Sequence, residues 1–289
     1  MVHEVMDSGD GGVLGAVGRP EGGGGTAVGL LLRAPDARGR PLVLLQRRAP
    51  GTLHGTRWGL PGGRRRGNET PTATALRAAA EQAGVHPGRV RVRGEQVHRD
   101  VDTCAAVIAD AAEPLPVPPD HEVADLAWVP ESEVAARDLD PAFAAGWSAL
   151  QVIETGLLVD AANVVGSRPD GWWRDRVGAA ERLLSEIAAV GLPGVLAIPE
   201  GGFRWFARPV VVLEGKANRA PDVAGVEVIR APASGDDTIV DVARRDGDWM
   251  VVTADRGLRA RLPVRARPVG PSTLRSWLTH PESETGAWG

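Results

Sequence analysis

Three aspartates stand where apolar strands are expected to end or a helix to begin. Asp160 follows the run LLV, Asp236 lies at the start of DDTIVDVA, and Asp255 follows WMVVTA. In a parallel sheet, ligands collect at the carboxyl ends of the strands, so acids from separated segments can converge there. Converging aspartates suit one or two Mg²⁺ or Mn²⁺ ions, which activate water in phosphodiester hydrolysis. Each aspartate alone is equally explained as a helix cap or a turn residue.

A second group of charged residues lies in GRRRGNETPTATALRAAAEQAGV, residues 63–85. Positions 78, 81 and 82 are spaced i, i+3 and i+4, so a helix would place them on one face. Ala78, Glu81 and Gln82 occupy these positions, and of the three only Glu81 is a carboxylate. One carboxylate with an amide and a methyl group does not readily hold a hard divalent cation. Any metal chemistry at this helix is therefore expected to be impaired.

The elements that position these residues are of two kinds. From Thr26 the apolar runs AVGLLL, LVLLQ, VRVRGEQV, TCAAVIA and DLAWV predict strands of a mixed sheet. Between them, Thr70, Pro71 and Gly84 predict a helix with a capped start, a proline in its first turn and a glycine at its end. From about Leu157, short strands alternate with helical stretches such as WWRDRVGAAERLLSEIAAV, which predicts a parallel sheet flanked by helices.

The length of 289 residues is sufficient for two domains. We expect a flexible glycine-rich tail over 1–25, an α+β domain over 26–152 and an α/β domain over 156–280, with a short link near QVIETG. The single cysteine excludes an intramolecular disulfide, and no apolar segment for export or membrane spanning is found, so we expect a cytoplasmic protein.

The overall charge limits how the chain could bind nucleic acid. A net charge of -4 and a pI near 5.9 argue against a protein that coats nucleic acid, so any contact must be local. Aromatic rings interleaved with arginines can bind single-stranded RNA, and the candidates are Arg168, Trp172, Trp173, Arg174 and Arg176. The alternative is that at least one tryptophan packs a helix onto the sheet. The run Arg64, Arg65 and Arg66 could hold phosphate or RNA, or form a solvated face.

The stretch 63–85 resembles the Nudix box, G-x5-E-x7-R-E-U-x-E-E-x-G-U, where U is a bulky apolar residue. The matching residues are Gly63, Glu69, Arg77, Glu81, Gly84 and Val85. The resemblance extends over about 26–150 and implies a Nudix fold, a nucleotide ligand and pyrophosphohydrolase chemistry. Ala78 and Gln82 depart from the pattern, which leaves Glu69, Arg77 and Glu81 as remnants that stabilise the loop and helix.

The second half, about 157–278, resembles the NYN branch of the PIN-like ribonucleases. The residues that carry the resemblance are Asp160, Asn163, Asp236 and Asp255. It implies a metal site at the three aspartates, with Asp237 as a fourth ligand and Asn163 orienting a ligand or the substrate.

The sequence leads to one main hypothesis and two alternatives. The main hypothesis is a hydrolase that uses Mg²⁺ or Mn²⁺ as an endoribonuclease on single-stranded RNA, with an impaired Nudix domain that recognises a nucleotide or substrate end. The first alternative is an active Nudix pyrophosphohydrolase on a nucleoside diphosphate derivative. The second is a non-catalytic nucleotide-sensing or scaffold protein. The oligomeric state stays open.

Overall fold

The computed structural model describes residues 27–50, 56–98, 104–115, 123–198 and 202–279, so the expected tail over 1–25 lies outside the described residues. By their contacts the described residues divide into two compact units. The first unit consists of residues up to 33, 42–109 and 114–150, and the second of 34–41, 110–113 and the chain from 151. Within the described ranges, no helix combines the length and the apolar character that a membrane crossing needs.

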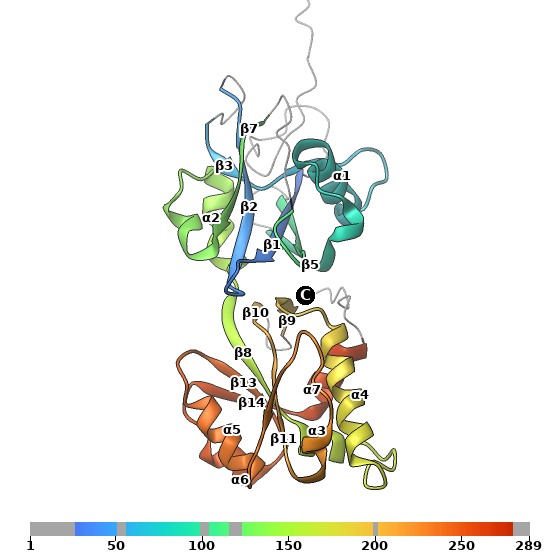
Figure 1. Ribbon diagram of the computed structural model, residues 1–289. Coiled ribbons are helices and arrows are strands. Elements are labelled where there is room, and N and C mark those ends of the chain that lie inside the picture. The colour runs from blue at the N-terminus through green and yellow to red at the C-terminus, as the bar shows by residue number, and fades with distance from the viewer. Residues whose placement is uncertain (1–26, 51–55, 99–103, 116–122, 199–201, 280–289) are drawn as a thin grey trace, which may run out of the picture. The chain divides into compact units, whose positions relative to one another are not determined.

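The first unit is built on a seven-stranded sheet with the order β3-β2-β1-β6-β5, to which β4 is added on β1 and β7 on β2. Its strands are β1 (Ala27–Pro35), β2 (Pro41–Arg48), β3 (Trp58–Gly59), β4 (Gly62–Arg64), β5 (Arg91–His98), β6 (Cys104–Asp110) and β7 (Val123–Pro130). Its helices are α1 (Pro71–Ala83) and α2 (Pro141–Leu150), with 3-10 turns η1 (Pro87–Arg89) and η2 (Glu131–Ala136). Figure 1 shows α1 and α2 on opposite sides of this sheet.

Helix α1 begins and ends at the residues predicted for it. The Thr70 side chain accepts a hydrogen bond from the backbone N–H of Ala73, Pro71 is the first helical residue, and Gly84 ends the helix with a left-handed φ of 61°. Glycine adopts this conformation without the steric cost that a Cβ brings. The face that packs inward carries small side chains: Thr74, Ala75, Ala78, Ala79 and Ala83. The helix therefore lies close to β4, its main neighbour.

The loop before α1 is held in place by the pairing of β4 with β1. Gly62 pairs with Gly29 in an antiparallel register. A Cβ at Gly62 would lie 2.5 Å from the carbonyl oxygen of Val28, which no side chain tolerates without a backbone shift. This close approach requires glycine and fixes the point from which the arginine-rich loop leaves the sheet.

The second unit contains seven strands and five α-helices in its described part. The strands are β8 (Ile153–Asp160), β9 (Gly194–Ala197), β10 (Phe203–Phe206), β11 (Val210–Leu213), β12 (Glu227–Arg230), β13 (Trp249–Val252) and β14 (Ala266–Val269). The helices are α3 (Ala161–Gly166), α4 (Arg176–Ala189), α5 (Gly235–Ala243), α6 (Arg256–Arg261) and α7 (Pro271–Thr279), with a 3-10 turn η3 (Gly215–Arg219). The segment expected to link two domains is thus the first part of β8.

Five strands of the second unit run parallel in the order β12-β11-β8-β13-β14, and β10 joins the first part of β8, also in parallel. Alternate residues of β8 point to opposite faces. Leu157 and Val159 pack in a core with α3, α4 and α7, whereas Leu158 packs in a core with α5 and α6. The helices lie on both sides of the sheet accordingly (Figure 1). Parallel sheets are typically covered in this way, and the arrangement leaves the strand ends accessible.

Candidate functional site

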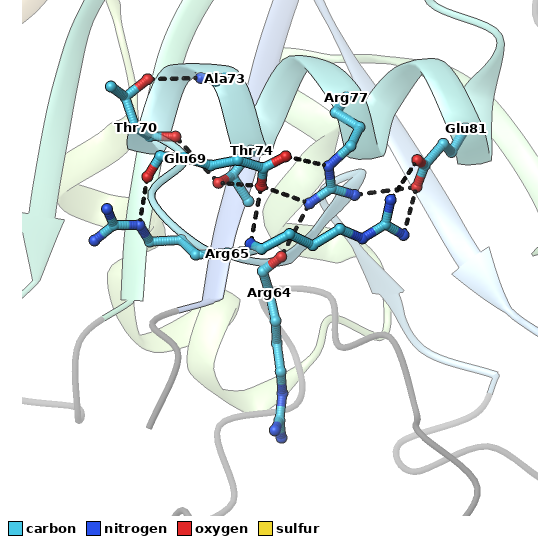
Figure 2. Close-up of polar contacts among 9 residues, drawn as sticks. Arg64, Arg65, Glu69, Thr70, Ala73, Thr74, Arg77 and Glu81 are labelled. Atoms are coloured by element: carbon cyan, nitrogen blue, oxygen red, sulfur yellow. Dashed lines mark hydrogen bonds and ion pairs between the residues drawn. The ribbon is translucent and has the colours of Figure 1, made fainter. Parts of the chain in front are cut away.

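A half-buried ion pair between Arg77 and Glu69 connects the loop after β4 to helix α1. Arg77 donates through Nε to Glu69 Oε1 at 2.7 Å and through Nη2 to Glu69 Oε2 at 2.9 Å. Glu69 Oε2 also accepts from the backbone N–H of Arg66 and from the Thr74 hydroxyl. The side-chain hydrogen bond from Arg77, supported by that of the Arg66 backbone, lowers the pKa of Glu69 to about 2. Figure 2 shows Glu69 enclosed by these donors. Glu69 is therefore a positioning residue that stays ionised at neutral pH.

A second ion pair closes the same loop onto the end of α1. The Arg66 guanidinium donates to both carboxylate oxygens of Glu81, at 2.9 and 3.2 Å, and Arg77 Nη1 adds a bond of 3.1 Å. The Arg66 and Glu81 side chains are 65% and 46% exposed, against 22% for each partner of the Arg77–Glu69 pair. The Glu81 carboxylate is thus paired with two arginines, and this pairing is exposed to solvent.

The three positions that share one broad side of α1 differ in their surroundings. Ala78 is 1% exposed and packs in the core, whereas Glu81 points outward. Gln82 uses its Oε1 to accept from the backbone N–H of Gly62 at 3.1 Å and from Gln46 Nε2 at 3.2 Å. The helical period of 3.6 residues brings the three positions onto one broad side of α1. Position 78, however, is buried in the core, and the side chain at position 82 is hydrogen-bonded to the neighbouring strands.

These residues do not form a resident metal cage. Within the described part of the chain, no group of three or more His, Cys, Asp or Glu side chains is arranged to hold a metal ion. Mg²⁺, however, is often bound through one or two carboxylates together with the phosphates of a substrate. Glu81, half-exposed beside the arginine loop, fits that second arrangement. The box therefore suits a cation that arrives with a phosphorylated ligand.

The second unit brings its predicted acids to one pocket of about 250 Å³. Asp160 ends β8 and accepts from the Asn163 backbone N–H in the first turn of α3. Asp236 lies in the first turn of α5, and Asp255 follows β13 and caps α6 through the N–H of Leu258. Asn163 joins two of these segments, because its Oδ1 accepts from the Ala254 backbone N–H at 2.7 Å. All four side chains line the pocket.

A fourth acid in this pocket was missed by the sequence analysis, and one predicted ligand lies elsewhere. Glu214 directly follows β11 and lines the pocket, and its Oε2 accepts from the backbone N–H of Gly235 at 2.9 Å. The run VVVLEG carried the signal, since it places an acid at the end of an apolar strand as LLVD does. Asp237 instead pairs with Arg261 and is not among the lining residues.

The electrostatics of the pocket are those of crowded carboxylates. Burial, followed by the charges of Asp236 and Glu214, raises the pKa of Asp160, against the hydrogen bonds from Asn163 and the Thr253 hydroxyl. Burial and the charge of Asp255 likewise raise the pKa of Asp236. Such a site favours a proton or a cation, because either relieves the repulsion.

The proposed RNA-stacking residues lie outside the pocket. Helix α4 begins at Arg176 behind an Asp175 cap, so the predicted helical start at the two tryptophans is wrong. Trp172 and Trp173 make an edge contact with each other, Trp173 is 57% exposed, and Arg176 lies over the Trp172 ring. Trp173 is exposed, whereas Trp172 is half-buried and lies close to Gly166 of α3. Arg168 pairs with Glu186, and Arg174 is exposed.

Comparison with known proteins identifies the first unit. The family model described as NUDIX domain matches residues 24–150. A Mycobacterium tuberculosis protein, provisionally named 8-oxo-dGTP diphosphatase 3, is 44% identical over 156 residues, which cover 52% of this chain and 72% of the relative. A Nucleoside triphosphate pyrophosphatase/Nudix hydrolase fusion protein of Bifidobacterium longum is 33% identical over 153 residues, which cover 50% of this chain and 32% of the relative.

Among solved structures, the Nudix hydrolase RenU of M. smegmatis is 46% identical, with 43% of this chain and 81% of that chain covered and a TM-score of 0.41. Nudix hydrolases generally depend on Mg²⁺ or Mn²⁺. The matched residues 24–150 contain the loop and helix described above, including Glu69, Arg77 and Glu81. The chain therefore belongs to the Nudix family of hydrolases.

Proposed function

We propose that the protein hydrolyses the phosphoanhydride bond of a nucleoside di- or triphosphate derivative at the box of its first unit. The observation that carries this proposal is the half-exposed Glu81 carboxylate beside an arginine-rich loop, within a domain of Nudix sequence. The name of the M. tuberculosis relative gives 8-oxo-dGTP as its substrate, which belongs to this chemical class. The impairment expected from Ala78 and Gln82 then lowers the rate without removing the activity.

The reaction needs few groups from the protein. A water oxygen forms a bond to phosphorus and the anhydride P–O bond breaks. The leaving group, diphosphate from a triphosphate or phosphate from a diphosphate, departs with the electron pair while the water proton passes to solvent. Glu81 together with the nucleotide phosphates would hold a divalent cation, which would offset negative charge on the phosphates. Guanidinium groups of the loop bind phosphate oxygens, since their planar donors match phosphate geometry. The Arg77–Glu69 pair holds the loop at the start of α1.

This proposal is tested by turnover of 8-oxo-dGTP, ordinary nucleoside triphosphates and a nucleotide sugar with Mg²⁺ or Mn²⁺, with products resolved by ion-pair chromatography. We expect slow, cation-dependent release of the nucleoside monophosphate, below about 1 s⁻¹ because two box carboxylates are replaced. Glu81→Gln removes the proposed carboxylate and should abolish the release. Glu133→Gln is the matched control, an exposed glutamate paired with Arg137 in the same unit. Equal rates for both variants would contradict the proposal.

A second candidate function rests on the pocket of the second unit. Asp160, Glu214, Asp236 and Asp255 line one pocket, at the strand ends where parallel sheets bind ligands. Phosphodiester hydrolysis of single-stranded RNA, as in NYN/PIN-like ribonucleases, would need these acids to close around Mg²⁺ or Mn²⁺, because among the described residues no three of them are arranged to hold a metal ion. The family comparison favours the Nudix activity, so the ribonuclease function stands second.

The second function is tested by incubating single-stranded RNA with the protein and Mn²⁺. Asp255→Asn keeps the size and the helix-capping oxygen but removes one charge, and should reduce cleavage by orders of magnitude. Asp237→Asn, whose side chain pairs with Arg261, is the control and should cleave like the wild type. Protein that cleaves neither RNA nor nucleotides, yet binds nucleotides, would favour a nucleotide-sensing or scaffold role.

A further inference from the structure

The box loop carries more positive charge than its carboxylates balance. Its charged side chains are Arg64, Arg65, Arg66 and Arg77 with Glu69 and Glu81. Four positive and two negative charges leave a net charge of +2 on this face. Figure 2 shows the Arg64 side chain extending away from the network, while its backbone carbonyl accepts from Arg77 at 3.0 Å. The loop therefore has an unbalanced positive charge that suits an anion.

The Arg77–Glu69 and Arg66–Glu81 ion pairs differ in a way that matters for ligand binding. The Arg77–Glu69 pair is 22% exposed on both sides, and Glu69 accepts two further hydrogen bonds. The Arg66–Glu81 pair is far more exposed, and exposed ion pairs contribute little to stability. A phosphate group offers Arg66 the same two-point contact as a carboxylate, with more charge. The inner pair is thus a fixed support, whereas the outer pair opens at small cost.

We propose that Arg66 and Glu81 form an exchangeable ion pair that couples diphosphate binding to cation binding at the box. When a diphosphate binds, Arg66 turns from Glu81 to the phosphate. Glu81 keeps its bond from Arg77 Nη1 through Oε2, and its released Oε1 becomes available to the cation that accompanies the nucleotide. Without a diphosphate, Arg66 itself neutralises Glu81 and no ion is retained there. This inference deepens the proposed function and rests on the box being the nucleotide site.

Opposite effects of two variants test the exchange. The probe is adenosine 5′-(α,β-methylene)diphosphate, which has no cleavable bridging oxygen, and its binding is measured by calorimetry in EDTA and in excess Mg²⁺. In EDTA, Arg66→Ala should weaken binding about tenfold through the loss of a charge-assisted contact. Glu81→Gln should strengthen binding in EDTA, because Arg66 no longer has to leave a charged partner. In Mg²⁺, the same Glu81→Gln variant should lose the gain in affinity that the wild type shows.

Controls separate this inference from general effects on charge and from the proposed function. Arg244→Ala removes an arginine of equal exposure, 65%, from the ion pair with Asp241 in the second unit, and should bind the probe like the wild type. Weaker or unchanged binding by Glu81→Gln in EDTA would overturn the exchange, as would equal affinities for Arg66→Ala and Arg244→Ala. If the protein turns over nucleotides but the variants do not show these changes in affinity, the proposed hydrolase function stands and the ion-pair exchange is overturned. If the variants show the changes in affinity but the protein turns over no nucleotide, the exchange stands and the hydrolase function is overturned.

Discussion

At the scale of single residues, the two departures from the Nudix pattern differ in their surroundings. Gln82 makes both of its contacts, to Gly62 N–H and Gln46 Nε2, through its side-chain oxygen. A glutamate accepts the same two hydrogen bonds and adds a charge next to Glu81. Ala78 is buried, so a glutamate there would place a charge in the core.

We therefore predict that Gln82→Glu raises nucleotide turnover about tenfold, equivalent to about 1.4 kcal/mol of transition-state stabilisation. It should also lower the Mg²⁺ concentration for half-maximal rate, because a second carboxylate adjoins Glu81. Initial rates across a Mg²⁺ titration measure both effects. Gln151→Glu, an exposed site in the second unit, is the control for added charge. Ala78→Glu should instead lower the melting temperature, and a faster Ala78→Glu enzyme of unchanged stability would contradict this reading.

At the scale of elements, the helix starts and strand ends decide which acids meet. In the folded state, burial and the neighbouring Asp255 raise the pKa of Asp236 above its ordinary 3.8. Because the folded state holds the Asp236 proton more tightly than the unfolded state, protonated Asp236 stabilises the fold at a pH below the unfolded-state pKa. This stability is lost as the pH rises through the folded-state pKa. The carboxylate cluster should therefore destabilise the second unit from about pH 4 upward, in the absence of a cation.

Asp236→Asn removes this titration and should melt above the wild type at pH 7, with a gap that closes as the pH falls below about 4. Saturating Mn²⁺ should raise the wild-type midpoint more than that of the variant, because the ion relieves repulsion among the acids. Thermal melts over a pH series, with and without Mn²⁺, measure both effects. Asp241→Asn on the same helix is the exposed control. A gap that is independent of pH would show that Asp236 is not part of a titrating cluster.

Elements with strong local signals could be predicted from the sequence, and side-chain partners could not. Thr70 and Gly84 fixed α1 because capping and left-handed backbone are local chemistry. Strand-end acids were expected to meet because parallel strands end at one edge, and Asp160 and Asp255 do line one pocket, although their metal and catalytic roles stay predictions. The Arg66–Glu81 pairing depends on how the loop folds back over the helix, which no local pattern encodes.

At the scale of the whole molecule, each unit has its own sheet, and the division does not follow a single cut in the sequence. Residues 34–41 and 110–113 belong to the second unit by their contacts. Trp205 Nε1 donates to the Gly39 carbonyl at 2.8 Å, and the Val195 backbone N–H donates to Asp110 Oδ2 at 3.3 Å. A boundary placed between 152 and 156 cannot include such segments, since composition and periodicity report only sequence neighbours.

Separate cores predict separate sensitivity to core mutation. Leu158 is fully buried in the cluster between the second unit's sheet and α5, so Leu158→Ala should cost about 2–5 kcal/mol of that unit's stability through lost burial and a residual cavity. The box lies in the first unit, which keeps its own strands and helices. Urea unfolding of the Leu158→Ala variant is followed by circular dichroism and by binding of a nucleotide analogue. Part of the ellipticity should be lost at a lower urea concentration than in the wild type, whereas analogue binding should persist up to the wild-type midpoint. A single transition, in which ellipticity and binding shift together, would show that the two units unfold as one cooperative structure.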